Sequence, residues 1–322
     1  MKRFLAGMAT GFWVLLAGTV FAKAAPEVPD TQVRVGMVLK TLNSQYWRTL
    51  AAGARDAAKA HQVDLILLGP PAEDAVEEQL ALVREVLDQG IQVLVFSPSQ
   101  PVRAVPVLME AKQRGIPVIV VDTAMPDTFQ DYAVFIGTAN GVAGRQGAQG
   151  LLEKLNPGAR VALMDGDPGN TTTGERIRAA EEVLRAAGLT IVAREAAYSD
   201  RERAYRIMQN LLQERSDIDG VFAANDEMAL GALRALQQQG RHDVTVIGVD
   251  GTADALHSIL RGELYGSLAQ KPYEMGRLSI EGALDLVAGR VRERQILNST
   301  ELVTIANAQE LLNFLSAILG KH

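Results

Sequence analysis

The chain has 322 residues, more than one hydrophobic core usually holds, so two domains are expected. Its 32 basic and 38 acidic residues give a net charge of −6 without any basic block, which argues against a nucleic-acid-binding protein. Cysteine is absent, so the sequence excludes a disulfide framework, a thiolate nucleophile, a zinc–thiolate site and a lipidated cysteine.

The first residues have the pattern of an export signal. Lys2-Arg3 precedes an apolar run at 4–22, and Ala22-Lys23-Ala24 offers a small-residue cleavage site. We therefore predict that residues 1–25 are a signal peptide and that the protein is periplasmic. A retained membrane anchor is the alternative, because the apolar run is nearly long enough to span a bilayer. The small residues within the run and the cleavage site behind it favour removal.

After a linker, short apolar runs typical of buried parallel strands alternate with helical patterns. A first series predicts strands at 33–39, 64–68, 93–97 and 118–122, with helices at 44–60, 72–88 and 104–114. A second series predicts strands at 134–136, 160–164, 190–193, 221–223, 244–249 and 265–269. Its helices are expected at 142–155, 173–187, 200–214, 228–239, 252–261 and 272–288. A last helix at 307–319 has leucines on one face, and we expect it to pack on the body of the protein.

Two similar α/β series predict two doubly wound, Rossmann-like lobes with a ligand cleft between them. Asp122, Asn225, Asp250 and Gln270 follow predicted strands, at the sheet edge where ligands bind in such folds. Asn and Asp are also common as caps and turn residues, which is the alternative for each position taken alone. The four histidines are scattered without metal-ligand spacing, so we expect no metal and no cofactor.

The run NDEMALGALRAL at 225–236, followed by IGVDGT at 247–252, resembles the sugar-binding proteins of bacterial ABC importers, of the ribose- and allose-binding type. The run VLKTLNSQYW at 38–47 is similar to the allose-binding branch. The resemblance is colinear over residues 33–305. It implies the periplasmic binding protein-like fold with three crossovers between the lobes. The N-terminal lobe would take residues 33–138 plus 271–298, and the C-terminal lobe 139–270 plus 299–322.

The resemblance also implies a set of ligand-binding residues. Sugars are bound by groups that donate and accept hydrogen bonds and by flat aromatic faces. Arg176 is expected to donate to hydroxyls while forked with a carboxylate, Trp47 to stack on the sugar, and Lys40 to contact a ring hydroxyl. The full set is Lys40, Ser44, Tyr46, Trp47, Asp122, Arg176, Asn225, Asp250 and Gln270. Departures from the ribose and allose patterns are Ser44, Ser97, Thr123, Ala139 and Ser199. They are compatible with a hexose, a ketose or a sugar alcohol instead of ribose.

These features predict an exported, monomeric solute-binding protein that captures a monosaccharide or related polyol and delivers it to an ABC permease, without catalysis. A sensor that presents its ligand to a chemoreceptor or sensor kinase is an alternative. An Asp-dependent phosphatase is another, because Asp165 and Asp167 follow a strand, but Pro168-Gly169 stands where a hydroxyl residue is expected. A transcription regulator of the lactose-repressor type is a further alternative, which the sequence argues against: it would carry a helix-turn-helix at the position where this chain has the predicted signal peptide.

Overall fold

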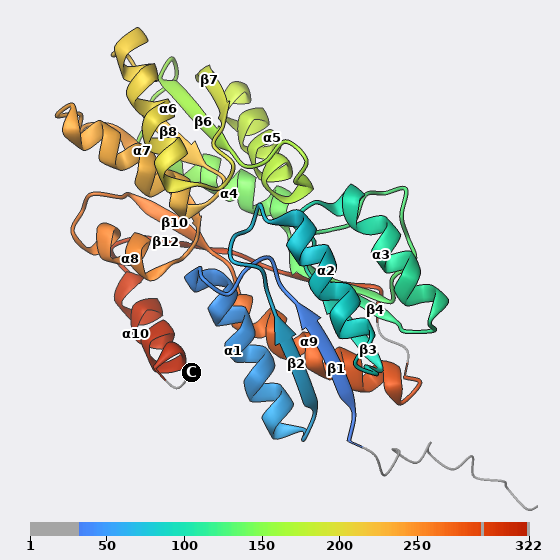
Figure 1. Cartoon of the computed structure of the whole chain (residues 1–322). Helices are drawn as coiled ribbons and strands as arrows, with labels where there is room; N and C mark the ends of the chain where they lie inside the picture. The colour runs from blue at the N-terminus through green and yellow to red at the C-terminus, as the bar shows by residue number, and fades with distance from the viewer. Residues whose placement is uncertain (1–31, 291–292, 321–322) are drawn as a thin grey trace, which may run out of the picture.

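The computed structural model describes residues 32–290 and 293–320, so the predicted signal peptide lies outside the described residues. Two six-stranded sheets, each flanked by helices, form the molecule (Figure 1). Among the described helices, none combines the length and the apolar character that crossing a membrane would require.

The first sheet has the strand order β11-β5-β4-β3-β1-β2, and all its strands are parallel. Its strands are β1 (Arg34–Val38), β2 (Asp64–Leu68), β3 (Val93–Phe96), β4 (Val118–Asp122), β5 (Val134–Thr138) and β11 (Gln295–Asn298). One face packs against α1 (Gln45–Ala60) and α9 (Pro272–Val287). The other face packs against α2 (Val76–Leu87) and α3 (Pro101–Gln113). The central strands β3 and β4 are buried along their whole length because helices cover both faces of the sheet.

The second sheet has the order β12-β10-β9-β8-β6-β7, and β12 alone in it runs antiparallel to its neighbour. Its strands are β6 (Arg160–Asp165), β7 (Thr190–Ala196), β8 (Gly220–Ala223), β9 (Thr245–Asp250), β10 (Gly266–Ala269) and β12 (Glu301–Val303). The helices around it are α4 (Asn140–Leu152), α5 (Thr171–Ala186), α6 (Arg201–Glu214), α7 (Asp226–Gln238) and α8 (Ala253–Leu260).

The predicted α/β class with two doubly wound units is confirmed. The chain passes between the sheets three times: after β5, after β10 and after β11. We call the part built on the first sheet the first lobe and the part built on the second sheet the second lobe. The exact lobe boundaries, 33–138 plus 271–298 and 139–270 plus 299–322, remain a proposal.

Several element limits differ from those predicted, each for a local reason. Helix α2 starts at Val76 instead of residue 72, because Ala75 leaves helical geometry with φ −78° and ψ 63°. Helix α3 starts three residues early because Pro101, pre-set for a first helical turn, opens it. Strands β11 and β12 were not predicted, since they have four and three residues and are half exposed.

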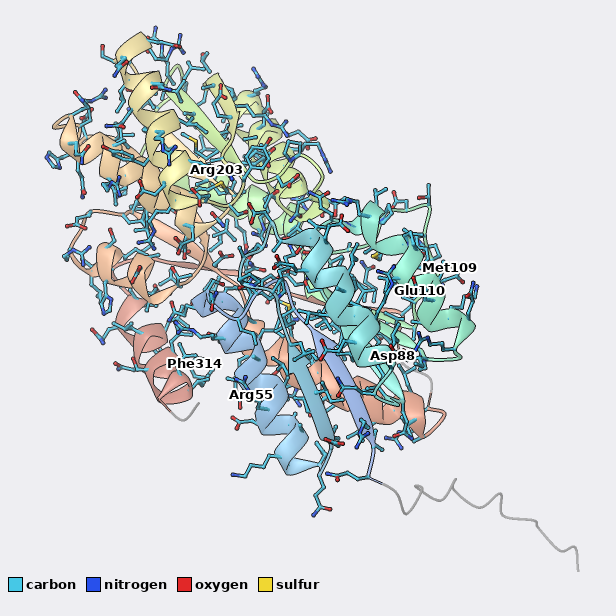
Figure 2. The ribbon with its side chains drawn as sticks, in the orientation of Figure 1. Arg55, Asp88, Met109, Glu110, Arg203 and Phe314 are labelled. Carbon is cyan, nitrogen blue, oxygen red and sulfur yellow. The ribbon has the colours of Figure 1, made fainter. Side chains whose placement is uncertain are left out.

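The C-terminal helix α10 (Ala308–Leu319) packs on the body, as predicted. It contacts α8 of the second lobe and α1 of the first. Phe314 of α10 (Figure 2) meets the ring of Tyr273 edge to face, with the ring centroids 6.1 Å apart. Helix α10 therefore touches both lobes beside the crossing segments.

Helices α1 and α9 approach each other through glycine. A Cβ on Gly53 would lie 1.9 Å from the carbonyl oxygen of Tyr273, and one on Gly276 would lie 2.0 Å from that of Leu50. Both neighbours are backbone atoms, which cannot move aside as a side chain could. The close contact fixes α1, and with it the residues at its N-terminus, against α9.

A buried carboxylate ties three parts of the second lobe together. Asp226 is fully buried at the start of α7 and accepts hydrogen bonds from the Ser267 hydroxyl (2.6 Å) and from the Thr252 amide and hydroxyl (2.8 and 3.1 Å). Burial raises the pKa of Asp226 to about 7, although these hydrogen bonds lower it. The carboxylate thereby anchors the turn that follows β9.

We predict that Gly276→Ala lowers the free energy of unfolding by about 1–3 kcal/mol, because the added methyl group overpacks the α1–α9 contact. Gly282→Ala in the same helix is the control, since its Cβ would meet only the flexible Ile119 side chain, at 3.2 Å. Chemical denaturation measures both. Equal stability of the two variants would show that the contact does not constrain α9.

We also predict that Asp226→Asn flattens the pH dependence of the unfolding temperature between about pH 4 and pH 7. A carboxyl group with a raised native pKa binds its proton more tightly when folded, so its contribution to stability is lost as pH rises through that window. Asp243→Asn is the control: a hydrogen bond from Arg241 lowers the pKa of Asp243 to about 2, outside the window. Parallel curves for wild type and Asp226→Asn would contradict the prediction.

Candidate functional site

The carboxyl ends of the strands in both sheets meet around a cavity of about 80 Å³ between the lobes. All nine residues predicted from the sequence line it: Lys40, Ser44, Tyr46, Trp47 and Asp122 from the first lobe, Arg176, Asn225 and Asp250 from the second, and Gln270 at the crossing after β10. The fold therefore gathers side chains separated by up to 230 positions. That they bind a ligand remains a prediction.

Two carboxylates face this cavity from strand ends with unusual backbone geometry. Asp122 ends β4 with φ 64°, and Asp250 ends β9 with φ 130°. Positive φ is uncommon for residues other than glycine and persists where surrounding contacts hold it. Asp122 accepts hydrogen bonds from the hydroxyls of Tyr46 (2.6 Å) and Thr123 (2.9 Å). The Gln270 amide donates to Asp250 (2.6 Å).

Arg176 is 3% exposed and lies beside Asp250. Its Nη1 is 3.8 Å from the Asp250 carboxylate, an ion pair longer than a hydrogen bond. Its close contacts are Nε to the Asn140 side chain and Nη1 to the Ala224 carbonyl, both 2.8 Å. The prediction that Arg176 forks with a carboxylate is therefore wrong. Its two short hydrogen bonds go to the Asn140 side chain and the Ala224 carbonyl, and Asp250 lies beyond hydrogen-bond distance. Burial raises the pKa of Asp250 well above its usual range, and Arg176 opposes that rise.

Two amide side chains have double roles. Asn225 caps α7, accepting a hydrogen bond from the Met228 amide at 2.9 Å, while it also lines the cavity. Asn225 is therefore both a helix cap and a lining residue of the cavity, so the two alternatives stated from the sequence do not exclude each other. The Gln270 side-chain oxygen accepts a hydrogen bond from the Thr138 hydroxyl (2.6 Å) and lies 3.3 Å from the Tyr46 hydroxyl, whose proton is shared mainly with Asp122. Because its amide group binds Asp250, Gln270 connects the two lobes.

The aromatic residues and Lys40 form the wall on the first lobe. Burial, and then the charge of Asp122, raises the pKa of Tyr46 well above its usual value, so its hydroxyl remains a donor. Trp47 is 2% exposed in the core, and its indole N–H donates to Glu73 at 2.7 Å. The Lys40 ammonium lies 5.6 Å from the centroid of the Trp47 ring.

Further lining residues were not among the predicted set: Gln45, Glu73, Asn170, Thr172, Thr173, Glu227 and Thr252. Most of them lie in segments that follow the carboxyl ends of β2, β6, β8 and β9. Asp122 and Asp250 were identified because ligands bind at the carboxyl ends of parallel strands. The same rule would have found most of the further lining residues if it had been applied to the whole loop that follows each strand. Ser199, noted only as a departure, also lines the cavity.

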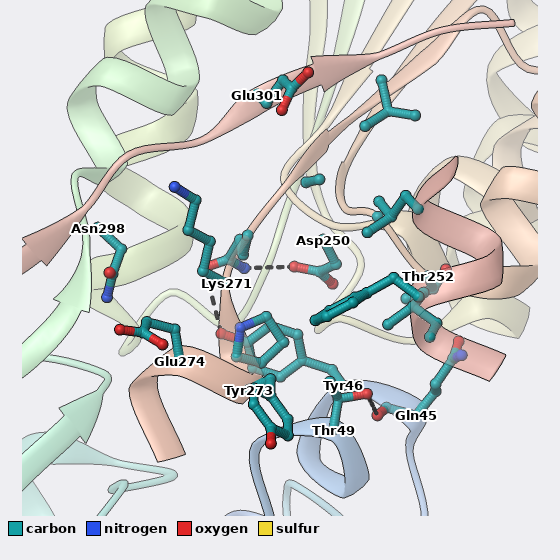
Figure 3. Close-up of a pocket in the computed structure, with 18 of the residues that line it drawn as sticks. Gln45, Tyr46, Thr49, Asp250, Thr252, Lys271, Tyr273, Glu274, Asn298 and Glu301 are labelled. Atoms are coloured by element: carbon teal, nitrogen blue, oxygen red, sulfur yellow. Dashed lines mark hydrogen bonds between the residues drawn. The ribbon is translucent and has the colours of Figure 1, made fainter. Parts of the chain in front are cut away.

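A larger cavity of about 630 Å³ lies on the side of the crossing segments, bounded by α1, α9 and α10 (Figure 3). Five residues line both cavities: Gln45, Tyr46, Asp250, Thr252 and Gln270. These side chains form the partition between the two spaces.

Direct contacts hold the lobes together around the site. The backbone amide of Ala253 in the second lobe donates to the side-chain oxygen of Gln45 in the first lobe at 2.7 Å. The side-chain amide of Gln100 in the first lobe donates to Asp167 in the second lobe, also at 2.7 Å. Arg203 of α6 (Figure 2) lies 3.7 Å from Asp74. The lobes therefore adopt a closed arrangement.

The phosphatase alternative gains no support from the geometry. Asp165 accepts a hydrogen bond from Arg194 (2.8 Å) and Asp167 from Gln100 and the Gly169 amide (2.8 Å). Neither residue lines the two cavities described above. Within residues 32–290 and 293–320, no group of three or more His, Asp or Glu side chains is placed to hold a metal ion.

Comparison with known proteins agrees with this architecture. Residues 35–290 match the periplasmic binding protein domain. The ribose import binding protein of Bacillus subtilis is 31% identical over 284 residues, covering 88% of this chain and 91% of that protein. The D-allose-binding periplasmic protein of Escherichia coli is 28% identical, covering 77% and 83%.

Solved structures show the same fold. An ABC transporter solute-binding protein from Actinobacillus succinogenes with bound D-allose superimposes with a TM-score of 0.82 at 25% identity, covering 87% of this chain and 100% of that one. One from Bacillus halodurans with bound myo-inositol has a TM-score of 0.80 at 26% identity, covering 88% and 98%. The resemblance inferred from the sequence is confirmed: the chain belongs to the periplasmic binding protein family.

Proposed function

We propose that the protein captures a monosaccharide or a related polyol between its lobes and delivers it to the permease of an ABC importer. The observation that carries the proposal is the single cavity lined by all nine predicted residues, drawn from both lobes and from the crossing. Relatives named for ribose and allose binding, and similar structures with bound D-allose and myo-inositol, support this ligand class.

The chemistry of the lining suits a ring of hydroxyls. Carboxylates accept from hydroxyl groups, Arg176 and Lys40 donate to them, and Asn225 and Gln270 can do both. Hydrogen bonds to charged partners are the stronger ones. An unmatched buried polar group costs about 1–3 kcal/mol, so the same groups discriminate between sugars.

The ligand works by closing the cleft. Each lobe supplies part of the lining, so a ligand makes its full set of contacts only when the lobes are together, and it shifts the population towards that state. The closed cavity of about 80 Å³ is smaller than typical pockets of roughly 300–1,000 Å³. Entry therefore requires the lobes to part, or Tyr46 to move towards the larger cavity that it also lines.

We further propose that the protein acts as a monomer after export and removal of residues 1–25, and that it catalyses no reaction. The apolar run and cleavage pattern of the N-terminus support export. The family consists of binding proteins, which supports a function without covalent chemistry.

Asp250→Ala is expected to abolish binding of the polyol, or to weaken it roughly 30-fold, because truncation removes a carboxylate that accepts hydrogen bonds from ligand hydroxyls, each worth about 1.5–3 kcal/mol. A chain without residues 1–25 has Trp47 as its single tryptophan, so its fluorescence reports ligand at the site. The ligands to titrate are ribose, allose and myo-inositol.

Asp131→Ala is the matched control, since Asp131 is exposed and pairs with Lys112. Circular dichroism checks that both variants fold. The proposal is contradicted if folded Asp250→Ala binds a polyol as tightly as the wild type, or if no polyol changes the fluorescence or melting temperature of the wild type.

A further inference from the structure

The cavity between the lobes contains more acidic than basic side chains. The first lobe supplies Glu73 and Asp122 with Lys40, and the second supplies Glu227 and Asp250 with Arg176. Each lobe therefore brings two carboxylates and one cation to the cleft. A neutral polyol can use these carboxylates as hydrogen-bond acceptors, but a carboxylate without a basic partner also suits an ammonium group.

Two of the four carboxylates are neutralised by arginine. Asp250 lies 3.8 Å from Nη1 of Arg176. Glu227 receives two hydrogen bonds from Arg201, of 2.8 and 3.0 Å. These pairs leave Lys40 as the cation of the cavity that faces the two remaining carboxylates.

Asp122 and Glu73 are held by uncharged donors. The hydroxyls of Tyr46 and Thr123 bind Asp122, and the Trp47 indole binds Glu73. Among the described residues, neither Asp122 nor Glu73 forms an ion pair with a basic side chain.

Lys40 alone does not neutralise both remaining carboxylates. It is 4% exposed, lies over the Trp47 ring, and has no hydrogen bond or ion pair to another described residue. Burial raises the pKa of Glu73, and although Lys40 lowers it, Asp122 and Glu227 raise it further. One ammonium group, that of Lys40, therefore shares the cavity with two carboxylates, Glu73 and Asp122, that have no basic partner within hydrogen-bond distance among the described residues.

The cavity also has buried donors without partners. The Thr172 hydroxyl, on a residue 5% exposed, and the Ser44 hydroxyl both line it and have no hydrogen-bond partner within the described parts of the chain. Buried hydroxyls of this kind find their partner in ordered water or in a polar ligand. Within the described residues, the acidic side chains of the cavity do not form a group of three that could hold a metal ion.

We propose that the ligand is a polyol with one amino group, an amino sugar or an aminocyclitol, whose ammonium group lies beside Glu73 and Asp122, the two carboxylates of the cavity that no arginine of the described chain pairs with. This inference rests on the proposed function and narrows its ligand class. Closing the cleft removes water from these two carboxylates, and a cation beside them replaces the lost solvation. An amine therefore favours the closed state more than its neutral analogue does.

The test is isothermal titration of the chain without residues 1–25 with matched ligands near pH 6.5: galactose, galactosamine and N-acetylgalactosamine, the corresponding glucose series, and myo-inositol with an amino-inositol. We expect one amine to bind at least about tenfold more tightly than its hydroxyl counterpart, because its hydrogen bonds are charge-assisted. Acetylation should remove the gain, and added salt should reduce it.

Glu73→Gln should bring the amine and its neutral counterpart to within about threefold of each other. Glu78→Gln, an exposed glutamate of α2 outside the cavity, should keep the full preference. The inference is overturned if neutral polyols bind and amines bind no better, or if glucuronate or galacturonate binds better than the amine; the proposed function would survive both results. If no polyol of any charge binds, the inference and the proposed function fail together.

Discussion

The interaction on which the structure depends is the meeting of buried carboxylates between two sheets. Asp122 and Asp250 end β4 and β9 in backbone conformations that aspartate seldom adopts. Water cannot solvate them fully when the lobes are closed, so protein groups must. Tyr46, Gln270 and Arg176 provide those contacts, and Gln270 does so across the lobes. The lobes can therefore close only if these carboxylates have hydrogen-bond partners. A ligand rich in hydroxyls can supply such partners by replacing some of the protein contacts.

The surroundings hold these side chains in place. Close backbone contact at Gly53 and Gly276 fixes α1 on α9, and α1 begins with Gln45, Tyr46 and Trp47. In the second lobe, buried Asp226 fixes the turn that leads from Asp250 into α8. Each half of the site is thus built on one lobe, and the lobes are connected by the three crossing segments and by α10, which touches both of them.

Much of this arrangement could be predicted from the sequence. Short β-rich runs bounded by Gly, Pro or Asp gave strand limits such as 64–68 and 118–122, which are the limits observed. The rule that parallel strands present ligands at their carboxyl ends placed Asp122, Asn225 and Asp250 together. The family resemblance added Trp47 and Arg176, which do not follow a strand, and it gave a role to Lys40, which lies just behind β1.

Other features depend on tertiary contacts and could not be predicted. Glu73 reaches the cavity because α2 starts late and Trp47 binds its carboxylate. The hydrogen-bond partners of Arg176, Asn140 and the Ala224 carbonyl, come from distant segments. Strands β11 and β12 are too short to have a pattern, and they exist because each extends a sheet that is already formed.

The most direct test of the central claim is the distance between the lobes, measured with and without ligand. The sequence has no cysteine, so Glu78→Cys on α2 and Arg206→Cys on α6 give two defined labelling sites on opposite lobes. Single-molecule energy transfer should show a mixture of distances without ligand and a shift to the short distance at saturating polyol. A polyol that binds without changing the distribution would contradict the account.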